Sequence, residues 1–567
     1  MEFNQANKCG AAFESIFPLE REIPERLRIT EPLDGSCYLL NGEICRWLGP
    51  VREVFSPVCL RRPAAEGVLA TTEGATAATA GASAEPKAKL IGYYPLCTEK
   101  VALAALDAAS RAYDNGRGLW PTLPIAERIK HFERFIGKMV AQREAVVKLL
   151  MWEIGKSQVD SEREFDRTVE YIRDTITALK ELDRRSARFT IDQGVIAQIR
   201  RSPLGVVLCM GPYNYPLNET FTTLIPALIM GNTVVFKPPK LGVLLHLPLL
   251  EAFRDSFPPG VVNTVYGDGA TVITPLMQSG RIDVLAFIGT SPVADVLKKH
   301  HPKPHRLRCV LGLEAKNPAI ILPDADLDLA VQECLLGSLA YNGQRCTAIK
   351  IIFVHADIAP AFVSKFAAAV DQLKVGLPWE DGVKITPLPE AHKPAYLKSL
   401  VEDAQTKGAR VVNPAGGKID ATFFYPAVLY PVNEQMAVYH EEQFGPVVPI
   451  GIFEDIQAPI DYIINSKYGQ QVSIFGSDPR ILSSIIDPLV NQVTRVNLNS
   501  QCQRGPDSFP FNGRKDSGEG TLSVADALRV FSIRTLVAAK AETLNKQILR
   551  QILNERTSNF LSTDFIF

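Results

Sequence analysis

From about Val195 onward, hydrophobic residues gather in short runs in which β-branched side chains are frequent. Gly, Pro and helical stretches separate these runs. They read VIAQI, LGVVLCM, NTVVFKPP, VVNTVYGDG, VLAFIGTS, NPAIILPDADL and IKIIFV. Short apolar runs of this kind are typical of buried strands, and strands that alternate with helices predict parallel βαβ units in an open sheet. The pattern therefore predicts an α/β protein.

Before these runs the pattern is helical. We predict helices over residues 99–114, 126–152 and 162–185. In the second of them, apolar residues recur at helical spacing: Ile129, Phe132, Ile136, Met139 and Val140. Near the end of the chain, residues 530–539 (VFSIRTLVAA) again predict a strand, and a polar helical tail follows it.

One segment has neither pattern. Residues 63–88 contain ten alanines in 26 positions and almost no large apolar side chains. Such a segment cannot bury enough surface to offset its loss of conformational entropy. We therefore predict a disordered insertion at the surface.

Composition and charge exclude several classes of partner. The 567 residues are 46% hydrophobic and 22% charged, and 61 basic side chains against 62 acidic ones leave a net charge of -1. That balance provides no field for binding nucleic acid or an anionic membrane. The sequence shows no signal peptide and no apolar run of about 18 residues, so we expect a cytoplasmic protein, with organelles as an alternative. Ten cysteines without a CxxC pair predict neither a disulfide framework nor a metal site.

Cys346 has the surroundings of a nucleophile. It lies in YNGQRCTAIK, where Asn342-Gly343 predicts a turn and Arg345 brings a positive charge. A thiol is nucleophilic as the thiolate, which an electropositive setting stabilises. A buried structural cysteine is the alternative, as it is for each of the ten.

A second segment supports the catalytic interpretation. MGPYNYPLNE follows the predicted strand LGVVLC, and its turn can hold the Asn214 amide at the carboxyl edge of a parallel sheet, where ligands bind. There the amide can donate to an oxyanion. Asn214 as a plain turn residue is the alternative.

At this point the chain resembles the aldehyde dehydrogenase superfamily from about Tyr38 to Ala539. Seven motifs occur in the order of that family: GPYNYPLN, VVFKPPK, VYGDG, FIGTS, AKNPAIILPDADL, NGQRCTA and EEQFGPVVP. The resemblance implies three parts. We expect a Rossmann-like cofactor domain at 1–187 and 204–308 and an α/β catalytic domain at 309–527. The third part is a β bridging element at 188–203 and 528–541. A tail at 542–567 follows these three parts. The bridge implies a homodimer or homotetramer.

Two motifs, NGQRCTAIK and NSQCQRGPDSFPFNGRKDSG, resemble the NADP-dependent non-phosphorylating glyceraldehyde-3-phosphate dehydrogenases more narrowly. That resemblance implies oxidation of the triose phosphate to 3-phosphoglycerate. The implied contacts to substrate are Arg167, Tyr215, Arg345, Thr347 and Arg504. Arginine suits a phosphate because it is always charged and bonds in a bidentate manner. Arginines that only solvate the surface are the alternative.

The same resemblance implies the cofactor contacts. They are Lys237, Lys240, Gly269, Gly289, Thr290, Glu442 and Phe444. NAD-preferring relatives often carry a glutamate at the position of Lys240, so a cation there favours the 2′-phosphate of NADP. Thr290 precedes a helix start, where free N–H groups attract anions. We expect NADP, with NAD as the alternative.

Two departures from the family pattern stand out. Ile273 replaces a glycine in GDGATVI, which changes the packing of that loop. Gly312, 34 residues before Cys346, occupies the position of the family's general-base glutamate. Two residues later the motif GLEAK has Glu314, and in an extended backbone it faces the same side about 6.6 Å away.

The implied mechanism is therefore attack by Cys346, oxyanion stabilisation by Asn214 and the Cys346 N–H, hydride transfer, and thioester hydrolysis served by Glu314. Because Gly312 cannot move a proton, release of the acyl group to coenzyme A or another acceptor is an alternative. A catalytically degenerate assembly protein is a third possibility, and the joint presence of Cys346, Asn214, Lys237 and Glu442 argues against it.

Overall fold

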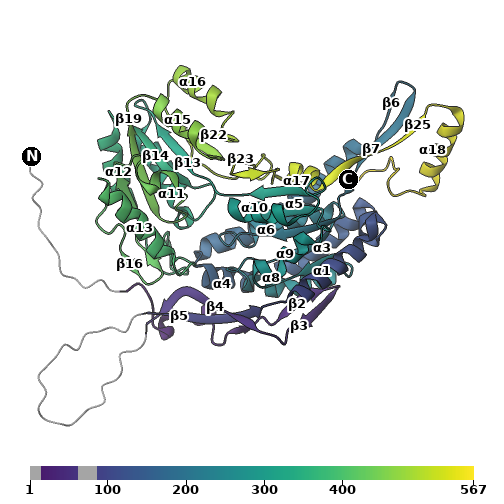
Figure 1. Ribbon diagram of the computed structural model, residues 1–567, viewed down its shortest axis with the longest axis horizontal. Helices are drawn as coiled ribbons and strands as arrows, with labels where there is room; N and C mark the ends of the chain where they lie inside the picture. The colour runs from purple at the N-terminus through teal and green to yellow at the C-terminus, as the bar shows by residue number, and fades with distance from the viewer. Residues whose placement is uncertain (1–14, 62–85, 567) are drawn as a thin grey trace, which may run out of the picture.

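The computed structural model describes residues 15–61 and 86–566. Two parallel sheets lie beside each other, and helices cover both (Figure 1). The strands of each sheet are joined through helices, as the alternating pattern predicts. The α/β fold class is confirmed.

The first sheet has six strands. Their order is β10 (Val262–Thr264), β9 (Thr233–Lys237), β8 (Val206–Met210), β11 (Val284–Ile288), β12 (Arg308–Gly312) and β24 (Gly518–Glu519). All neighbours pair in parallel except β12 and β24, which are antiparallel. Helices α1 (Glu99–Tyr113), α6 (Asn218–Ile229) and α10 (Ser291–His300) follow or flank these strands.

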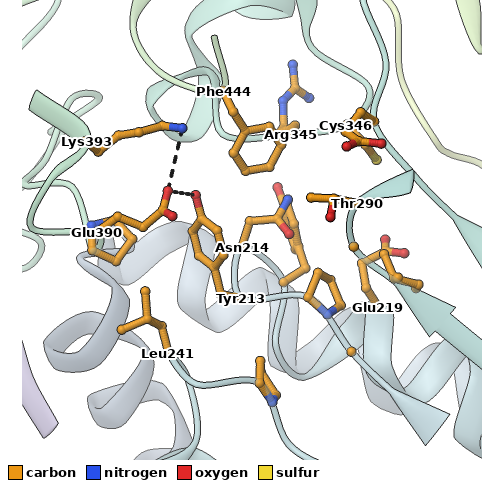
Figure 2. A pocket seen from close by; sticks show the side chains of 18 of the residues that line it. Tyr213, Asn214, Glu219, Leu241, Thr290, Arg345, Cys346, Glu390, Lys393 and Phe444 are labelled. Carbon is orange, nitrogen blue, oxygen red and sulfur yellow. Dashed lines mark hydrogen bonds and ion pairs between the residues drawn. The ribbon is translucent and has the colours of Figure 1, made fainter. Parts of the chain in front are cut away.

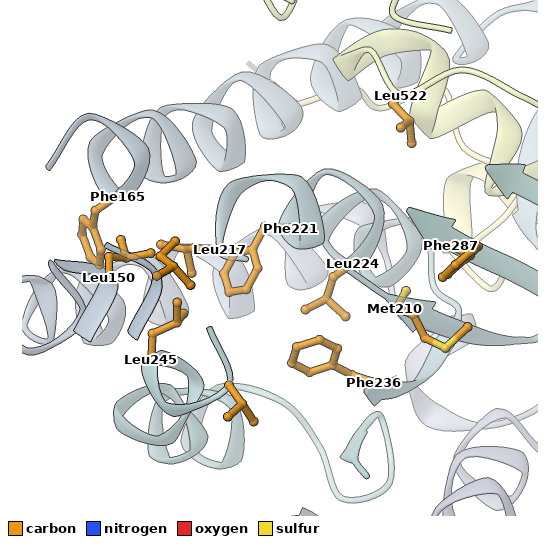
Figure 3. Close-up of a cluster of buried hydrophobic side chains, with 14 of the residues drawn as sticks. Leu150, Phe165, Met210, Leu217, Phe221, Leu224, Phe236, Leu245, Phe287 and Leu522 are labelled. Atoms are coloured by element: carbon orange, nitrogen blue, oxygen red, sulfur yellow. The ribbon is translucent and has the colours of Figure 1, made fainter. Parts of the chain in front are cut away.

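The core beneath this sheet is built from the apolar runs of its strands. Met210, Phe236 and Phe287 meet Phe221 and Leu224 of α6 in one buried cluster (Figure 3). Every residue of β8 and of α6 is buried. Burial of both faces explains why these segments read as continuous apolar runs without alternation.

The second sheet has seven strands. Their order is β15 (Arg410–Val411), β18 (Ala427–Tyr430), β19 (Val447–Phe453), β14 (Ile349–His355), β13 (Asn317–Ile321), β21 (Gln471–Phe475) and β22 (Arg495–Leu498). Helices α11 (Leu327–Leu339), α12 (Ala359–Asp371) and α13 (Lys393–Thr406) accompany it. The seven strands predicted from apolar runs are therefore all strands, but they belong to more than one sheet.

A third sheet projects from the body (Figure 1). It joins β6 (Phe189–Asp192), β7 (Val195–Pro203) and β25 (Ser532–Lys540) in antiparallel pairs. The segments predicted to form a β bridge do pair with each other, although β25 begins 343 residues after the start of β6. Helix α18 (Thr543–Glu555) follows β25, as the polar tail predicts.

The structure differs from the predictions in three places. The predicted helix 126–152 is two helices, α3 (Ile125–Val140) and α4 (Arg143–Ile154). Both pack on α5 (Gln158–Ser186), but α3 also packs on α7 (Leu250–Ser256), whereas α4 packs on β4 (Val51–Leu60). The predicted boundary at 308/309 falls within β12, whose hydrogen bonds to β11 keep it in the first sheet.

The third difference concerns the predicted insertion at 63–88. Residues 63–85 lie outside the described part of the chain. Lys87 and Ala88 begin β5 (Lys87–Pro95), where they pair with Leu60 and Cys59 of β4 (Val51–Leu60). Pairing with a distant strand gives these two residues an ordered backbone that their own composition does not predict.

Candidate active site

A cavity of about 1330 Å³ is lined by residues from both large sheets and their connecting loops. Cys346 and Arg345 come from the loop before β14, whereas Asn214 and Glu219 come from the segment after β8 (Figure 2). Two strand ends of separate sheets thus contribute to one site. Asn214 follows the carboxyl end of β8, where open α/β sheets bind ligands, whereas Cys346 precedes the amino end of β14.

Cys346 follows a turn of left-handed backbone. Tyr341, Asn342 and Gly343 have φ values of 50°, 56° and 70°. The Cys346 carbonyl is then fixed by two donors, Asn317 Nδ2 at 2.8 Å and Lys350 Nζ at 2.9 Å. These bonds hold the backbone of the predicted nucleophile to the start of β13 and β14.

The thiol of Cys346 lies in a low-dielectric setting. Burial raises its pKa to about 11, and the charge of Glu219 adds to the rise, whereas Lys350 and Arg504 oppose it. The thiol is therefore protonated at neutral pH in this state. Arg345, which the sequence placed as the activating cation, instead donates from Nη2 to the Leu336 and Gly337 carbonyls at 3.2 and 2.8 Å.

Asn214 reaches the same turn. Its Nδ2 donates to the Gln344 carbonyl at 2.8 Å, and the residue is almost fully buried. A side-chain amide nitrogen carries two hydrogens, so one remains for another acceptor. Asn214 therefore has the placement and the chemistry of an oxyanion donor beside Cys346.

A buried ion pair holds the loop that carries Asn214. Lys156 Nζ pairs with Glu164, and both side chains are fully buried. Lys156 also donates to the Asn214 carbonyl at 2.7 Å, while Glu164 Oε1 accepts the Leu217 N–H at 3.0 Å. The pair connects α5 (Gln158–Ser186) to the loop, so it orients Asn214 through the backbone.

The residues predicted to bind substrate all line the cavity: Arg167, Tyr215, Arg345, Thr347 and Arg504. Two of the arginines are already paired with acids. Arg167 makes a bidentate pair with Asp507 at 2.7 and 2.9 Å, and Arg504 pairs with Glu219 and, at 3.3 Å, with Asp507. The guanidinium groups of Arg167, Arg345 and Arg504 outnumber the carboxylates of Glu219 and Asp507. This part of the cavity therefore carries a net positive charge.

The predicted cofactor residues divide into two groups. Lys240, Gly289, Thr290, Glu442 and Phe444 line the cavity, whereas Lys237 and Gly269 do not. Lys237 ends β9 behind the lining, where burial and then the charge of Lys240 lower its pKa to about 8. Gly269 begins the short helix α8 (Gly269–Val272) directly after Asp268.

Glu442 and Phe444 lie near the nucleophile. Glu442 Oε1 pairs with Lys350 Nζ at 2.7 Å and accepts the Ala315 N–H at 3.1 Å. Since Lys350 also bonds the Cys346 carbonyl, one lysine connects Glu442 to the nucleophile's backbone. Phe444 packs edge-on against Tyr213 with ring centroids 5.9 Å apart.

Glu314 follows β12, and its carboxylate lies at the start of α10. Its Oε2 accepts the Ser291 N–H at 2.8 Å, next to Thr290. The carboxylate thus satisfies one of the free N–H groups at a helix N-terminus, where an anion is favoured. Glu314 lines the same cavity as Cys346, and Gly312 before it carries no acid.

Sequence reasoning missed several charged residues of this cavity. Arg52 makes a bidentate pair with Asp268 at 3.0 Å for both bonds, beside Lys240. Glu219 and Asp507 lie among the predicted phosphate-binding arginines. Glu219 and Asp507 were visible in the quoted motifs GPYNYPLNE and QRGPDSFPF, but their pairing depends on contacts between distant segments.

The described residues form neither a membrane-spanning helix nor a cluster that could hold a metal ion. No helix formed by residues 15–61 or 86–566 combines the length and apolar character needed to span a membrane. In the same part of the chain, no three His, Cys, Asp or Glu side chains gather in a way that would hold a metal ion.

Comparison with known proteins agrees with this arrangement. The model of the aldehyde dehydrogenase family matches residues 75–537. The chain belongs to the aldehyde dehydrogenase family. The predicted membership is thus confirmed, and with it the prediction of an aldehyde dehydrogenase enzyme.

Individual relatives are more specific. An NADP-dependent glyceraldehyde-3-phosphate dehydrogenase of Streptococcus equinus is 34% identical over 428 residues, which are 74% of this chain and 87% of that protein. The enzyme of the same name from Pisum sativum is 30% identical over 454 residues, covering 78% and 88%.

Among solved structures, the NADP-dependent glyceraldehyde-3-phosphate dehydrogenase of Bacillus halodurans C-125, complexed with NADP, superposes with a TM-score of 0.78 at 30% identity. The match covers 90% of this chain and 100% of that one. The aldehyde dehydrogenase fold is therefore confirmed over most of the chain.

Proposed function

We propose that this aldehyde dehydrogenase oxidises glyceraldehyde 3-phosphate to the carboxylic acid with NADP, through a thiohemiacetal and a thioester on Cys346. One observation carries the proposal. Cys346 and Asn214 line a single cavity together with the arginines predicted to bind phosphate and with five of the seven predicted cofactor residues. The names of the relatives support the same substrate and cofactor.

The donor set of the cavity fits a phosphorylated dinucleotide. Lys240 and Arg52 bring two positive charges to one region, and Asp268 leaves that region with a net positive charge. A 2′-phosphate there would gain charge-assisted hydrogen bonds. A bound NADP would supply the hydride acceptor for the thiohemiacetal, while the protein supplies orientation and electrostatics.

The first step forms a bond between the Cys346 sulfur and the aldehyde carbon. The Cys346 thiol gives its proton to solvent, the thiolate attacks the aldehyde carbon, and the carbonyl oxygen takes negative charge as the thiohemiacetal forms. The Asn214 amide and the Cys346 N–H donate to that oxygen. Asn317 and Lys350 keep the Cys346 carbonyl in place, so that its N–H stays directed at the reacting centre.

The phosphate end of the substrate lies at Arg167, Arg345, Arg504 and Tyr215 in this proposal. Because Glu219 and Asp507 already pair with two of these arginines, an incoming phosphate must share or displace a carboxylate. A dianion that bonds arginine in a bidentate manner competes well with a single carboxylate. Thr347 lies beside Cys346 and lines the same end of the cavity.

Thioester hydrolysis requires a proton acceptor, and Gly312 cannot be one. Glu314 remains the acceptor predicted from the sequence. Its carboxylate must leave the Ser291 N–H before it can serve a water at Cys346. The absence of an acid at Gly312 also favours acyl transfer to coenzyme A as the second candidate function.

The deciding experiment is NADP reduction with glyceraldehyde 3-phosphate, in the presence and absence of coenzyme A. We expect turnover without coenzyme A and a much higher KM for unphosphorylated glyceraldehyde. Cys346→Ala is the control: it should lose oxidation and still bind NADPH, as measured by fluorescence. Turnover that depends on coenzyme A would establish acyl transfer instead, and an inactive wild-type protein would support the degenerate alternative.

A further inference from the structure

Glu219 is a buried carboxylate in the aldehyde end of the cavity. It lies in the first turn of α6, five residues after Asn214, and only 8% of its surface is exposed. Figure 2 shows it among the residues that line the pocket with Cys346 and Asn214. Burying a carboxylate is costly unless it is paired, and Arg504 supplies the partner of Glu219.

Glu219 is placed to act on Cys346. Of the charged groups around the thiol, Glu219 has the largest effect on its pKa, and that effect is a rise. Glu219 and Cys346 also line the same cavity, so the carboxylate and the thiol face one shared space.

The other carboxylates that line the cavity near Cys346 are engaged elsewhere. Glu442 is bonded to Lys350 and to the Ala315 N–H, and Glu314 is bonded to the Ser291 N–H. Glu390 accepts the Tyr213 hydroxyl at 2.7 Å. Glu219 likewise uses one oxygen, Oε2, but its partner is Arg504, so it alone of these four carboxylates pairs with a residue predicted to bind substrate.

We propose that Glu219 is the proton acceptor for hydrolysis of the Cys346 thioester, in place of the glutamate that the family carries at the position of Gly312. A water oxygen bonds to the acyl carbon while one water proton passes to Glu219. The carbon–sulfur bond then breaks, and its electron pair returns to Cys346. The acid leaves, and the proton on Glu219 returns to solvent.

Arg504 is the partner that holds this carboxylate. If the proposed function is correct, the substrate phosphate competes with Glu219 for Arg504. Substrate binding then frees Glu219 to accept a hydrogen bond from a water in the cavity.

The test compares Glu219→Gln with Glu314→Gln, using glyceraldehyde 3-phosphate and NADP. We expect Glu219→Gln to release about one NADPH per active site rapidly and then to turn over about 10²- to 10⁴-fold more slowly than wild type. Mass spectrometry should find the acyl adduct on Cys346. Unchanged steady-state turnover in Glu219→Gln, or an adduct that accumulates only in Glu314→Gln, would overturn the proposal.

A second measurement separates chemistry from structural damage. Removing the Glu219 charge should lower the pKa of Cys346, so iodoacetamide should alkylate the thiol of Glu219→Gln faster than that of wild type at pH 8. A distorted pocket would not combine faster alkylation with slower hydrolysis. If Glu219→Gln does not fold, Glu219→Asp retains the acid one methylene further away, and its thioester should decay more slowly than in wild type; an unchanged decay rate would count against the proposal.

Different outcomes would refute the proposed function and the role of Glu219. Absence of any NADPH burst from wild-type enzyme with the triose phosphate would refute the proposed function. A normal burst followed by normal turnover in Glu219→Gln would refute only the role of Glu219.

Discussion

Lys240 illustrates how a residue's role depends on its neighbours. The sequence places it at the position where NAD-preferring relatives carry a glutamate. The structure adds Asp268, 3.5 Å from its Nζ, and Arg52, which bonds the same carboxylate. Two cations and one anion then surround the predicted site of the 2′-phosphate.

We predict that Lys240→Glu reverses the coenzyme preference. Each charge-assisted contact contributes about 1.5 to 3 kcal/mol, so its loss should reduce kcat/KM with NADP roughly ten- to a hundredfold. Efficiency with NAD should change little. Lys130→Glu, on the exposed surface of α3, is the matched control for charge. Steady-state kinetics with both coenzymes measure the ratio, and an unchanged ratio in Lys240→Glu would contradict the assignment.

Cys346 shows the limit of reasoning from adjacent residues. Its neighbour Arg345 suggests an activated thiolate, but the guanidinium bonds the carbonyls at the end of α11. Burial therefore dominates and raises the pKa of the thiol to about 11. Below that pKa the thiolate fraction decreases about tenfold per pH unit, so activation depends on the ligands that enter the cavity.

At the scale of elements, the turn before Cys346 positions the nucleophile. Asn342 locks the turn by accepting the Thr386 N–H at 2.9 Å and donating to its hydroxyl at 3.1 Å. Gly343 has a φ of 70°, and a Cβ there would lie 2.7 Å from the Ser338 oxygen and 2.8 Å from the Gly445 oxygen. Both obstacles are backbone atoms, which cannot move aside easily.

We predict that Gly343→Ala displaces the nucleophile and lowers kcat/KM at least tenfold. Gly382→Ala is the matched control, because Gly382 has a φ of 74° and no atom within 4 Å of its added Cβ. Left-handed backbone alone should cost each variant about 1 kcal/mol of folding free energy. Thermal unfolding measures that shared loss. Equal activity of the two variants would mean that the turn tolerates the clash.

The elements themselves follow closely from the sequence. The apolar runs and the helical spacing predict β8, β9, β11, β13 and β14 and the helices α1 and α5. These segments are predictable because burial on one or both faces leaves a periodic signal in the sequence. The break between α3 and α4 has no such signal, since both halves remain apolar at helical spacing.

At the scale of the whole molecule, the projecting sheet β6–β7–β25 exposes apolar side chains. Ile191, Ile533, Leu536 and Val537 are 66%, 45%, 56% and 37% exposed. A group of exposed apolar residues often marks an interface with another protein. The prediction of a homodimer or homotetramer through this sheet therefore has a structural basis to test.

We predict that Leu536→Asp weakens self-association, because it places a charge in the proposed interface. Ile481→Asp is the control, since Ile481 is 40% exposed on α16 (Pro479–Leu489), away from the projecting sheet (Figure 1). Sedimentation velocity measures the assembly. We expect a shift to smaller species for Leu536→Asp alone, and identical sedimentation of both variants would place the interface elsewhere.

The sequence by itself determined the fold class, the order of strands and helices, and the family motifs at the strand ends. It also singled out Cys346 and Asn214 and most of the predicted substrate and cofactor residues that line the same cavity. These features depend on local periodicity and on short motifs, and both are written in consecutive residues.

Only the tertiary structure decided which charges meet. Glu219 and Arg504 are 285 residues apart in sequence, and Arg167 and Asp507 are 340 apart, yet each pair brings an arginine to the lining of one cavity. The hydrogen bond from the Ser291 N–H to Glu314 and the edge pairing of β24 are likewise contacts between distant segments. The energy of a charge depends on burial and on its partners in space, so local sequence does not determine it.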